Sequence, residues 1–208
     1  VTDFTAPTGT LTQTPTGATN GNVTLNLTSI ADTGGSGYYR TKLPNGTFVT
    51  TATASEVVTS NGTYSFVIYD NAGNSTTKSI TVSNIDKTLP TGDISQTPTG
   101  ATNGDVTLNL TAIADTGGSG YYRTKLPNGT FVTTTSASEV VTTNGTYNFV
   151  IYDNAGNSTT KSITVSNIDK TAPTGTLTQT PTAPTNGNVT LNLTSIADTG
   201  GSGFYSIR

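Results

Sequence analysis

The chain has 208 residues and a net charge of −3, and it contains no Cys, Met, Trp or His. Disulfide, thiol and imidazole chemistry are therefore excluded. The faint acidity argues against a nucleic-acid partner, because no basic stripe is present to replace phosphate counterions. Threonine and other β-branched residues suit half-buried strands, and no long segment has a period of 3.6 residues. These features predict an all-β protein.

Alternating stretches separated by turn formers predict seven strands in the first 85 residues. The clearest is the second, in which Val23, Leu25 and Leu27 alternate with polar residues. The loops between the strands are rich in Pro, Gly and Asn, which favour turns. In chain order, the predicted strands are 10–13, 23–28, 38–43, 47–51, 56–59, 62–69 and 78–82.

The sixth and seventh strands form a predicted hairpin with a polar tip. Phe66 and Ile68 alternate with outward-facing residues, and the strand ends in the turn-forming sequence from Asp70 to Asn74. Tyr64 lies two residues before inward-facing Phe66, which is the position of a tyrosine corner in immunoglobulin-like domains. In a tyrosine corner the phenol donates a hydrogen bond to nearby backbone; the alternative is that Tyr64 is simply an aromatic residue of the core.

The sequence repeats with a period of 83 residues. Asp3 corresponds to Asp86 and Asp169, and the first two copies are identical at about six positions in seven. Seven strands in a unit of this size are typical of an immunoglobulin-like (Ig-like) β-sandwich. We therefore predict tandem Ig-like β-sandwich domains of about seven strands each. The predicted domains are 1–85, 86–168 and a truncated third copy, 169–208, and we expect the chain to be a fragment of a longer array.

Two motifs together resemble the tandem bacterial Ig-like repeats of large cell-surface adhesins. The first is the hairpin tip from Asp70 to Ser75, and the second is the linker from Ile85 to Thr91. The second copy repeats both, at 153–158 and 168–174. The resemblance implies an extracellular location on a bacterial cell surface or cell wall. It also implies a structural stalk, in which stacked domains hold a binding region away from the cell.

The stalk interpretation determines the partners that we expect. Each repeat would contact its neighbours in the same chain, and any host surface or glycan would be bound by regions outside this chain. No apolar run is long enough to span a membrane, so we expect no membrane contact within it. A signal peptide or an anchor would lie outside these residues.

Three carboxylates per domain are predicted to meet at one end of the sandwich. In an Ig-like fold the domain entry, the loop after the second strand and the last hairpin share one pole. In the first repeat these segments carry Asp3, Asp32 and Asp70, with Asn71 and Asn74; in the second they carry Asp86, Asp115 and Asp153, with Asn154 and Asn157. Ca²⁺ takes six to eight oxygen ligands of these kinds, and some adhesin repeats bind calcium at domain junctions. Calcium at the junctions is therefore one hypothesis.

The alternative is local turn chemistry. Asp and Asn side chains commonly bond nearby backbone N–H groups, so that Asp32 would cap its own loop and Asp86 the linker turn. The sequence lacks an EF-hand or nonapeptide calcium motif.

Two other functions remain open. Tyr38, Tyr39 and Tyr69, with Arg40, would serve a module that binds a glycan or a host protein, although alternation places only one of Tyr38 and Tyr39 outside. The open strand edges of the third copy would serve a self-assembling filament. We expect no enzymatic activity, because the carboxylates lie at loop tips without a paired acid and base.

Overall fold

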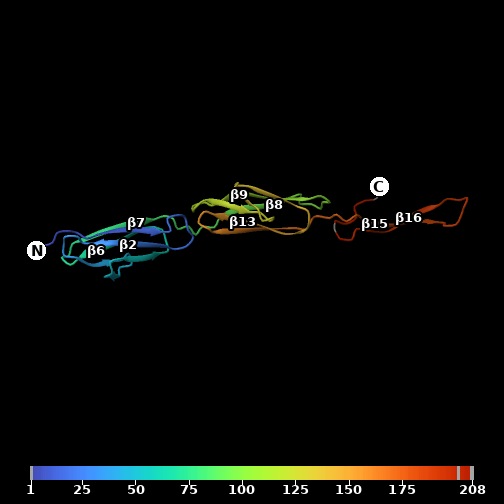
Figure 1. The fold of residues 1–208 in the computed structure, drawn as a ribbon. Coiled ribbons are helices and arrows are strands. Elements are labelled where there is room, and N and C mark those ends of the chain that lie inside the picture. Colours follow the sequence, from blue (N-terminus) through green and yellow to red (C-terminus); the bar gives the residue numbers. More distant parts are fainter. Residues whose placement is uncertain (1, 201, 207–208) are drawn as a thin grey trace. The chain divides into compact units, whose positions relative to one another are not determined.

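The computed structural model describes residues 2–200 and 202–206 and consists of strands, turns and loops (Figure 1). Residues 1, 201, 207 and 208, which fall in the predicted first and third copies, lie outside the described residues. Among the described residues there is no helix, and hence none that is long and apolar enough to cross a membrane. The all-β prediction is confirmed.

The first repeat forms two antiparallel sheets. One has the order β1-β2-β5 and the other the order β4-β3-β6-β7. The strands are β1 (Thr8–Thr14), β2 (Val23–Ala31), β3 (Tyr38–Lys42), β4 (Phe48–Val49), β5 (Ala54–Val58), β6 (Gly62–Asp70) and β7 (Ser75–Val82). All seven predicted strands are present, and the two sheets are consistent with a β-sandwich. The Ig-like identity of that sandwich stays a prediction.

The core of the first repeat comes from the alternating faces of its strands. Leu25 of β2 and Phe66 and Ile68 of β6 are completely buried, as their alternation with polar residues predicts. The other buried members are Val23, Leu27, Leu43, Val58, Val82 and Ile85. The phenol of Tyr64 donates a hydrogen bond of 2.8 Å to the carbonyl of Ser60, so the bond predicted for a tyrosine corner is present.

The ends of the first and fourth strands differ from the prediction. The fourth strand contains only Phe48 and Val49, because Thr47 donates its backbone N–H to the side chain of Asn45 and so belongs to the turn. The first strand is longer than predicted, since its pairing with β2 continues to Thr14 opposite Thr24.

The second repeat reproduces this arrangement. Its sheets have the orders β12-β9-β8 and β11-β10-β13-β14. The strands are β8 (Thr91–Thr97), β9 (Val106–Ala114), β10 (Tyr121–Lys125), β11 (Phe131–Val132), β12 (Ala137–Val141), β13 (Gly145–Asp153) and β14 (Ser158–Val165). Phe149 and Ile151 are completely buried, like Phe66 and Ile68, and Tyr147 repeats the hydrogen bond of Tyr64 through the carbonyl of Thr143.

The third copy contributes a two-stranded sheet, β15 (Thr174–Thr180) and β16 (Thr190–Ala197). The residue pairing of β15 with β16 matches that of β1 with β2. Leu191 is nevertheless 67 % exposed, whereas the equivalent Leu25 and Leu108 are completely buried. Within the described part of the chain, no further strand covers this face.

Entry and exit lie at opposite poles of the first repeat. The N-terminal segment bonds the β2–β3 loop, where Ser36 donates to Asp3. The exit, at Ile85, forms a parallel bridge with Thr19 in the β1–β2 loop, and the backbone of Asp86 donates to the carbonyl of Thr19 at 2.9 Å. We call these the entry pole and the exit pole.

The chain forms two compact units whose limits differ from the repeat boundaries. The first unit contains the residues up to Pro90, with Asp115–Tyr122 and Tyr152–Ser158; the second contains Thr91–Ala114, Arg123–Ile151 and the residues from Thr159 onward. The entry-pole loops of the second repeat therefore belong to the same unit as the first repeat. The predicted domain boundaries at 85 and 168 stay a prediction.

Candidate metal centre

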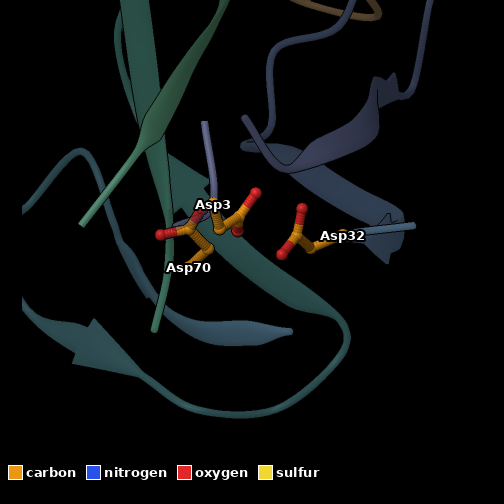
Figure 2. Close-up of side chains that lie close together, drawn as sticks. All are labelled: Asp3, Asp32 and Asp70. Atoms are coloured by element: carbon orange, nitrogen blue, oxygen red, sulfur yellow. The ribbon is translucent and has the colours of Figure 1, made fainter. Parts of the chain in front are cut away.

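The three predicted carboxylates of the first repeat meet at the entry pole. Asp3 precedes β1, Asp32 follows β2, and Asp70 ends β6, so three segments distant in sequence supply them. Figure 2 shows the carboxylates turned toward one another, and one oxygen of each lies within 4.8 Å of the others. The pairing of Tyr38 with Asp70 fixes the end of β6 beside the β2–β3 loop.

Asp3 is held by two backbone N–H groups. Its Oδ1 accepts from Thr5 at 2.9 Å, and its Oδ2 accepts from Ser36 at 2.6 Å. These bonds, first that from Thr5 and then that from Ser36, hold the pKa of the Asp3 carboxyl below its ordinary value, because they favour the charged form. Asp3 is thus a carboxylate at neutral pH.

Asp32 offers an oxygen that the protein leaves without a hydrogen bond. Its Oδ2 accepts from the backbone of Gly37 at 2.8 Å, which confirms the predicted cap of its own loop. Its Oδ1 is shielded from solvent and has no hydrogen-bond partner. A shielded carboxylate oxygen without a hydrogen-bond partner is costly, and this oxygen is therefore available to coordinate a cation.

Asp70 is the most deeply buried of the three, at 1 % exposure. Its two oxygens accept from the backbone N–H and the side-chain Nδ2 of Asn74, at 2.8 and 2.7 Å. The same Nδ2 group lies 3.2 Å from the carbonyl of Asp3 and 3.3 Å from that of Thr5. Asn74 therefore acts as a donor that joins the hairpin tip to the N-terminal segment.

Asn71 is also a donor in this arrangement. Its Nδ2 lies 3.0 Å from the carbonyls of Ser36 and Gly37, and its backbone N–H also bonds Gly37. The two predicted asparagines thus join loops through their amide nitrogens. The carboxylate oxygens that lie within 4.8 Å of one another at this pole belong to the three aspartates.

The second repeat builds the same cluster, with more burial. Asp86 accepts from Thr88 and Ser119 at 2.8 and 2.7 Å, which confirms the predicted cap of the linker turn. Equivalent bonds join Asp115 to Gly120, Asp153 to Asn157, and Asn154 to the carbonyls of Ser119 and Gly120. Asp115 Oδ1, like Asp32 Oδ1, is buried without a partner.

Two residues that sequence reasoning missed shape the entry pole. Ser36 donates its N–H to Asp3, and its Oγ accepts from the backbone of Ala72 at 2.9 Å. A Cβ atom on Gly35 would lie 2.5 Å from Asp3 Oδ2 and 2.7 Å from Asp32 Oδ2, so only glycine leaves room for these carboxylates. The signal in the sequence is Gly-Gly-Ser-Gly, which all three copies carry at 34–37, 117–120 and 200–203.

The donor set fits a hard divalent cation. Three carboxylates whose nearest oxygens lie within 4.8 Å of one another repel one another, and a cation among them would relieve that repulsion. Asp32 Oδ1 and Asp115 Oδ1 supply one unused, shielded oxygen to each cluster. Calcium accepts carboxylates and backbone carbonyls in flexible geometry, so Asp3, Asp32 and Asp70 would hold it in the first repeat, and Asp86, Asp115 and Asp153 in the second. Calcium at these positions stays a prediction.

The acid stability of the junction is expected to depend on Asp86. Burial alone raises the pKa of its carboxyl, but the N–H groups of Thr88 and Ser119 outweigh burial and hold the pKa below 3.8. Because the folded pKa lies below the unfolded one, the stabilisation is fully present above pH 3.8 and is lost as the pH falls through the lowered pKa.

Asp86→Asn is therefore expected to be less stable than the wild type at neutral pH and to lose less stability on acidification. Denaturant unfolding from neutral to strongly acidic pH, without divalent ions, measures both effects. Asp93→Asn, at an exposed position of β8, is the control. If the free energy of unfolding changed with pH in the same way in Asp86→Asn and the wild type, the Asp86 carboxylate would not be the source of the acid dependence.

Tyr39 and Tyr69 of the alternative binding module pack around Arg40. Tyr39 is 49 % exposed, whereas Tyr38 is half-buried and its hydroxyl lies 3.2 Å from the carbonyl of Val49. The Arg40 guanidinium lies over the rings of Phe48, Tyr39 and Tyr69, at 4.0, 5.0 and 5.6 Å from their centres. The arginine therefore occupies one side of these rings, and a sugar could not stack on that side.

The fold and the site together define a class of protein: all-β repeats with an acidic cluster at the entry pole. Residues 119–173 match the family model of the SHIRT domain, a repeated domain of bacterial surface proteins. The matched segment begins in the loop before β10 and runs through β14 into the next linker. No curated protein matches the chain.

Proposed function

We propose that the chain is a non-catalytic spacer in the stalk of a bacterial surface protein, where the repeats stack end to end. The supporting observation is that Asp86 bonds loops of two successive repeats. Its backbone N–H donates to Thr19 of the first repeat, and its carboxylate accepts from Ser119 of the second. A linker bonded on both sides leaves little free chain between repeats.

The surroundings of Asp86 support a stiff connection. Asn157 donates its Nδ2 to the carbonyl of Asp86 at 3.0 Å, and the N–H of Asn20 donates to the carbonyl of Ala155 at 3.1 Å. Pro90, just beyond, fixes its own φ and restricts Leu89. The match to a repeated surface domain and the near-identity of the copies also favour a spacer, because length and stiffness require no specialised copy.

Small-angle scattering on chains with different repeat numbers tests the spacer. The largest dimension is expected to grow by roughly 35–45 Å for each added repeat, from strands of six to eight residues at about 3.3 Å per residue with their loops. If the largest dimension instead grew with about the square root of the repeat number, as in a flexible chain, the proposal would be overturned. Light scattering after gel filtration tests the filament alternative, and retention on glycan or host-protein arrays tests the binding module.

A second role, calcium binding that stiffens the junction, is favoured by the orphaned oxygens Asp32 Oδ1 and Asp115 Oδ1. We expect calorimetric titration to detect Ca²⁺ binding, which Asp32→Asn and Asp115→Asn weaken by at least about tenfold because each removes a carboxylate ligand. Asp93→Asn is expected to bind like the wild type. Absence of binding at millimolar Ca²⁺ would leave turn formation as the only role of the clusters.

A further inference from the structure

Seven Asn-Gly pairs occur in the chain, and each is chemically capable of a self-modification. The backbone nitrogen of the glycine can attack the side-chain carbonyl carbon of the asparagine, because glycine has no side chain to obstruct the approach. Asparagine is accordingly among the thermally labile residues. The asparagines of these pairs are Asn20, Asn45, Asn61, Asn103, Asn128, Asn144 and Asn186.

Hydrogen bonds hold four of these seven side chains away from that reaction. Asn61 donates to the carbonyl of Ile85 at 2.8 Å and accepts its N–H at 2.9 Å, and Asn144 holds Ile168 in the same way. Asn45 donates to Glu56 at 2.8 Å and accepts two bonds from Thr47; Asn128 does the same with Glu139 and Thr130. Each amide must break at least two hydrogen bonds before it can rotate toward the glycine nitrogen.

The other three asparagines occupy one position that recurs in each copy. Asn20, Asn103 and Asn186 are exposed in the loop after the first strand, and within the described residues their side chains make no hydrogen bond. The following glycine N–H donates only to the hydroxyl of the preceding threonine, at 3.0 Å in each copy. Water can replace that bond without cost to the fold.

We propose that Asn20, Asn103 and Asn186 are self-modification sites that convert to aspartate and isoaspartate while the protein stays folded. In the first loop, the Gly21 nitrogen bonds to Asn20 Cγ as the Cγ–Nδ2 bond breaks. Ammonia leaves with the proton lost from the glycine nitrogen. Water then opens the cyclic imide at either carbonyl, and no oxidant or reductant is consumed.

Modification at Asn20 would alter the exit pole, a consequence that rests on the proposed spacer function. The backbone N–H of Asn20 bonds Ala155, and Thr19 bonds the backbone of Asp86. Conversion adds a negative charge close to the acidic cluster of the second repeat, and isoaspartate also lengthens the backbone by one methylene. Both changes weaken the contacts beside Asp86, so the stiffness of the junction would decrease with the age of the protein.

The test is a site-by-site comparison of the folded and the unfolded full chain. Both are incubated at mildly alkaline pH, and peptide mapping by mass spectrometry follows the gain of one mass unit at each asparagine. Rates at Asn20, Asn103 and Asn186 are expected to be similar in the two states. At the other four sites the folded protein should react at least about tenfold more slowly, because two hydrogen bonds of about 1 kcal/mol each must first open.

Equal folded-state rates at all seven sites, or protection at Asn20 and Asn103 equal to that at Asn61, would overturn the proposal. Asn20→Gln, which has a longer side chain and closes the ring poorly, should abolish the mass gain in that peptide alone. Hydrogen exchange at the backbone amide of Asp86, which donates to the carbonyl of Thr19, is compared before and after ageing between wild type and Asn20→Gln and tests the effect on the junction. A chain that proves flexible in scattering would remove the spacer function and leave the modification map unchanged.

Discussion

Replacing Phe66 by alanine is expected to lower the free energy of unfolding of the first repeat by about 3–5 kcal/mol. Phe66 is completely buried between the two sheets, so its loss removes a large apolar side chain and leaves a cavity. Small domains have only about 5–15 kcal/mol of stability, which makes this the most damaging single truncation that we predict for the repeat.

Hydrogen exchange read by mass spectrometry can follow this effect in each repeat separately. Amides of β2 and β6 should lose protection in Phe66→Ala, while those of β9 and β13, around the intact Phe149, keep theirs. Phe48→Ala is the matched control, because Phe48 is 47 % exposed and its loss mainly removes the contact with Arg40. A similar loss of protection in both variants would contradict the core assigned to Phe66.

Asn157→Ala is expected to destabilise the second repeat by about 2–4 kcal/mol in the absence of divalent ions. The Nδ2 of Asn157 lies 2.7 Å from Asp153 Oδ2 and also bonds the carbonyl of Asp86. Asp153 is 1 % exposed, so truncation leaves a buried carboxylate with one bond fewer and no access to water.

Asn128→Ala is a matched control in the same repeat. Its Nδ2 also donates to a carboxylate, Glu139, at 2.8 Å, but this pair is exposed. Asn128 also accepts two bonds from Thr130, but all three bonds are exposed and water can replace them, so we expect a loss of about 1 kcal/mol or less, clearly below that for Asn157→Ala. Equal costs for the two variants in denaturant unfolding would show that burial of the Asp153 carboxylate contributes nothing.

The acidic clusters show how far a sequence pattern predicts a site. The strand order of a sandwich brings the entry segment, the loop after β2 and the β6–β7 turn to one pole, so the meeting of Asp3, Asp32 and Asp70 followed from the predicted topology. The topology did not predict which carboxylate oxygens accept hydrogen bonds. That depends on the backbone N–H groups of Ser36 and Gly37, which donate to Asp3 and Asp32. That Asn71 and Asn74 donate through nitrogen likewise depends on carbonyls that only folding brings near.

The sequence by itself determined the all-β class, the period of 83 residues, the seven strands of a repeat and the inward faces of β2 and β6, because these depend on local alternation and on turn formers. Only the tertiary structure decided which atoms meet between segments distant in the sequence. It left Asp32 Oδ1 without a partner and joined Asp86 to loops of two repeats. It also bonded the side chain of Asn61 to Ile85, while the side chain of Asn20, in the same Asn-Gly pair, makes no hydrogen bond. The physical reason is that a hydrogen bond depends on distance and direction, and the chain sets both for distant residues only when its sheets have packed.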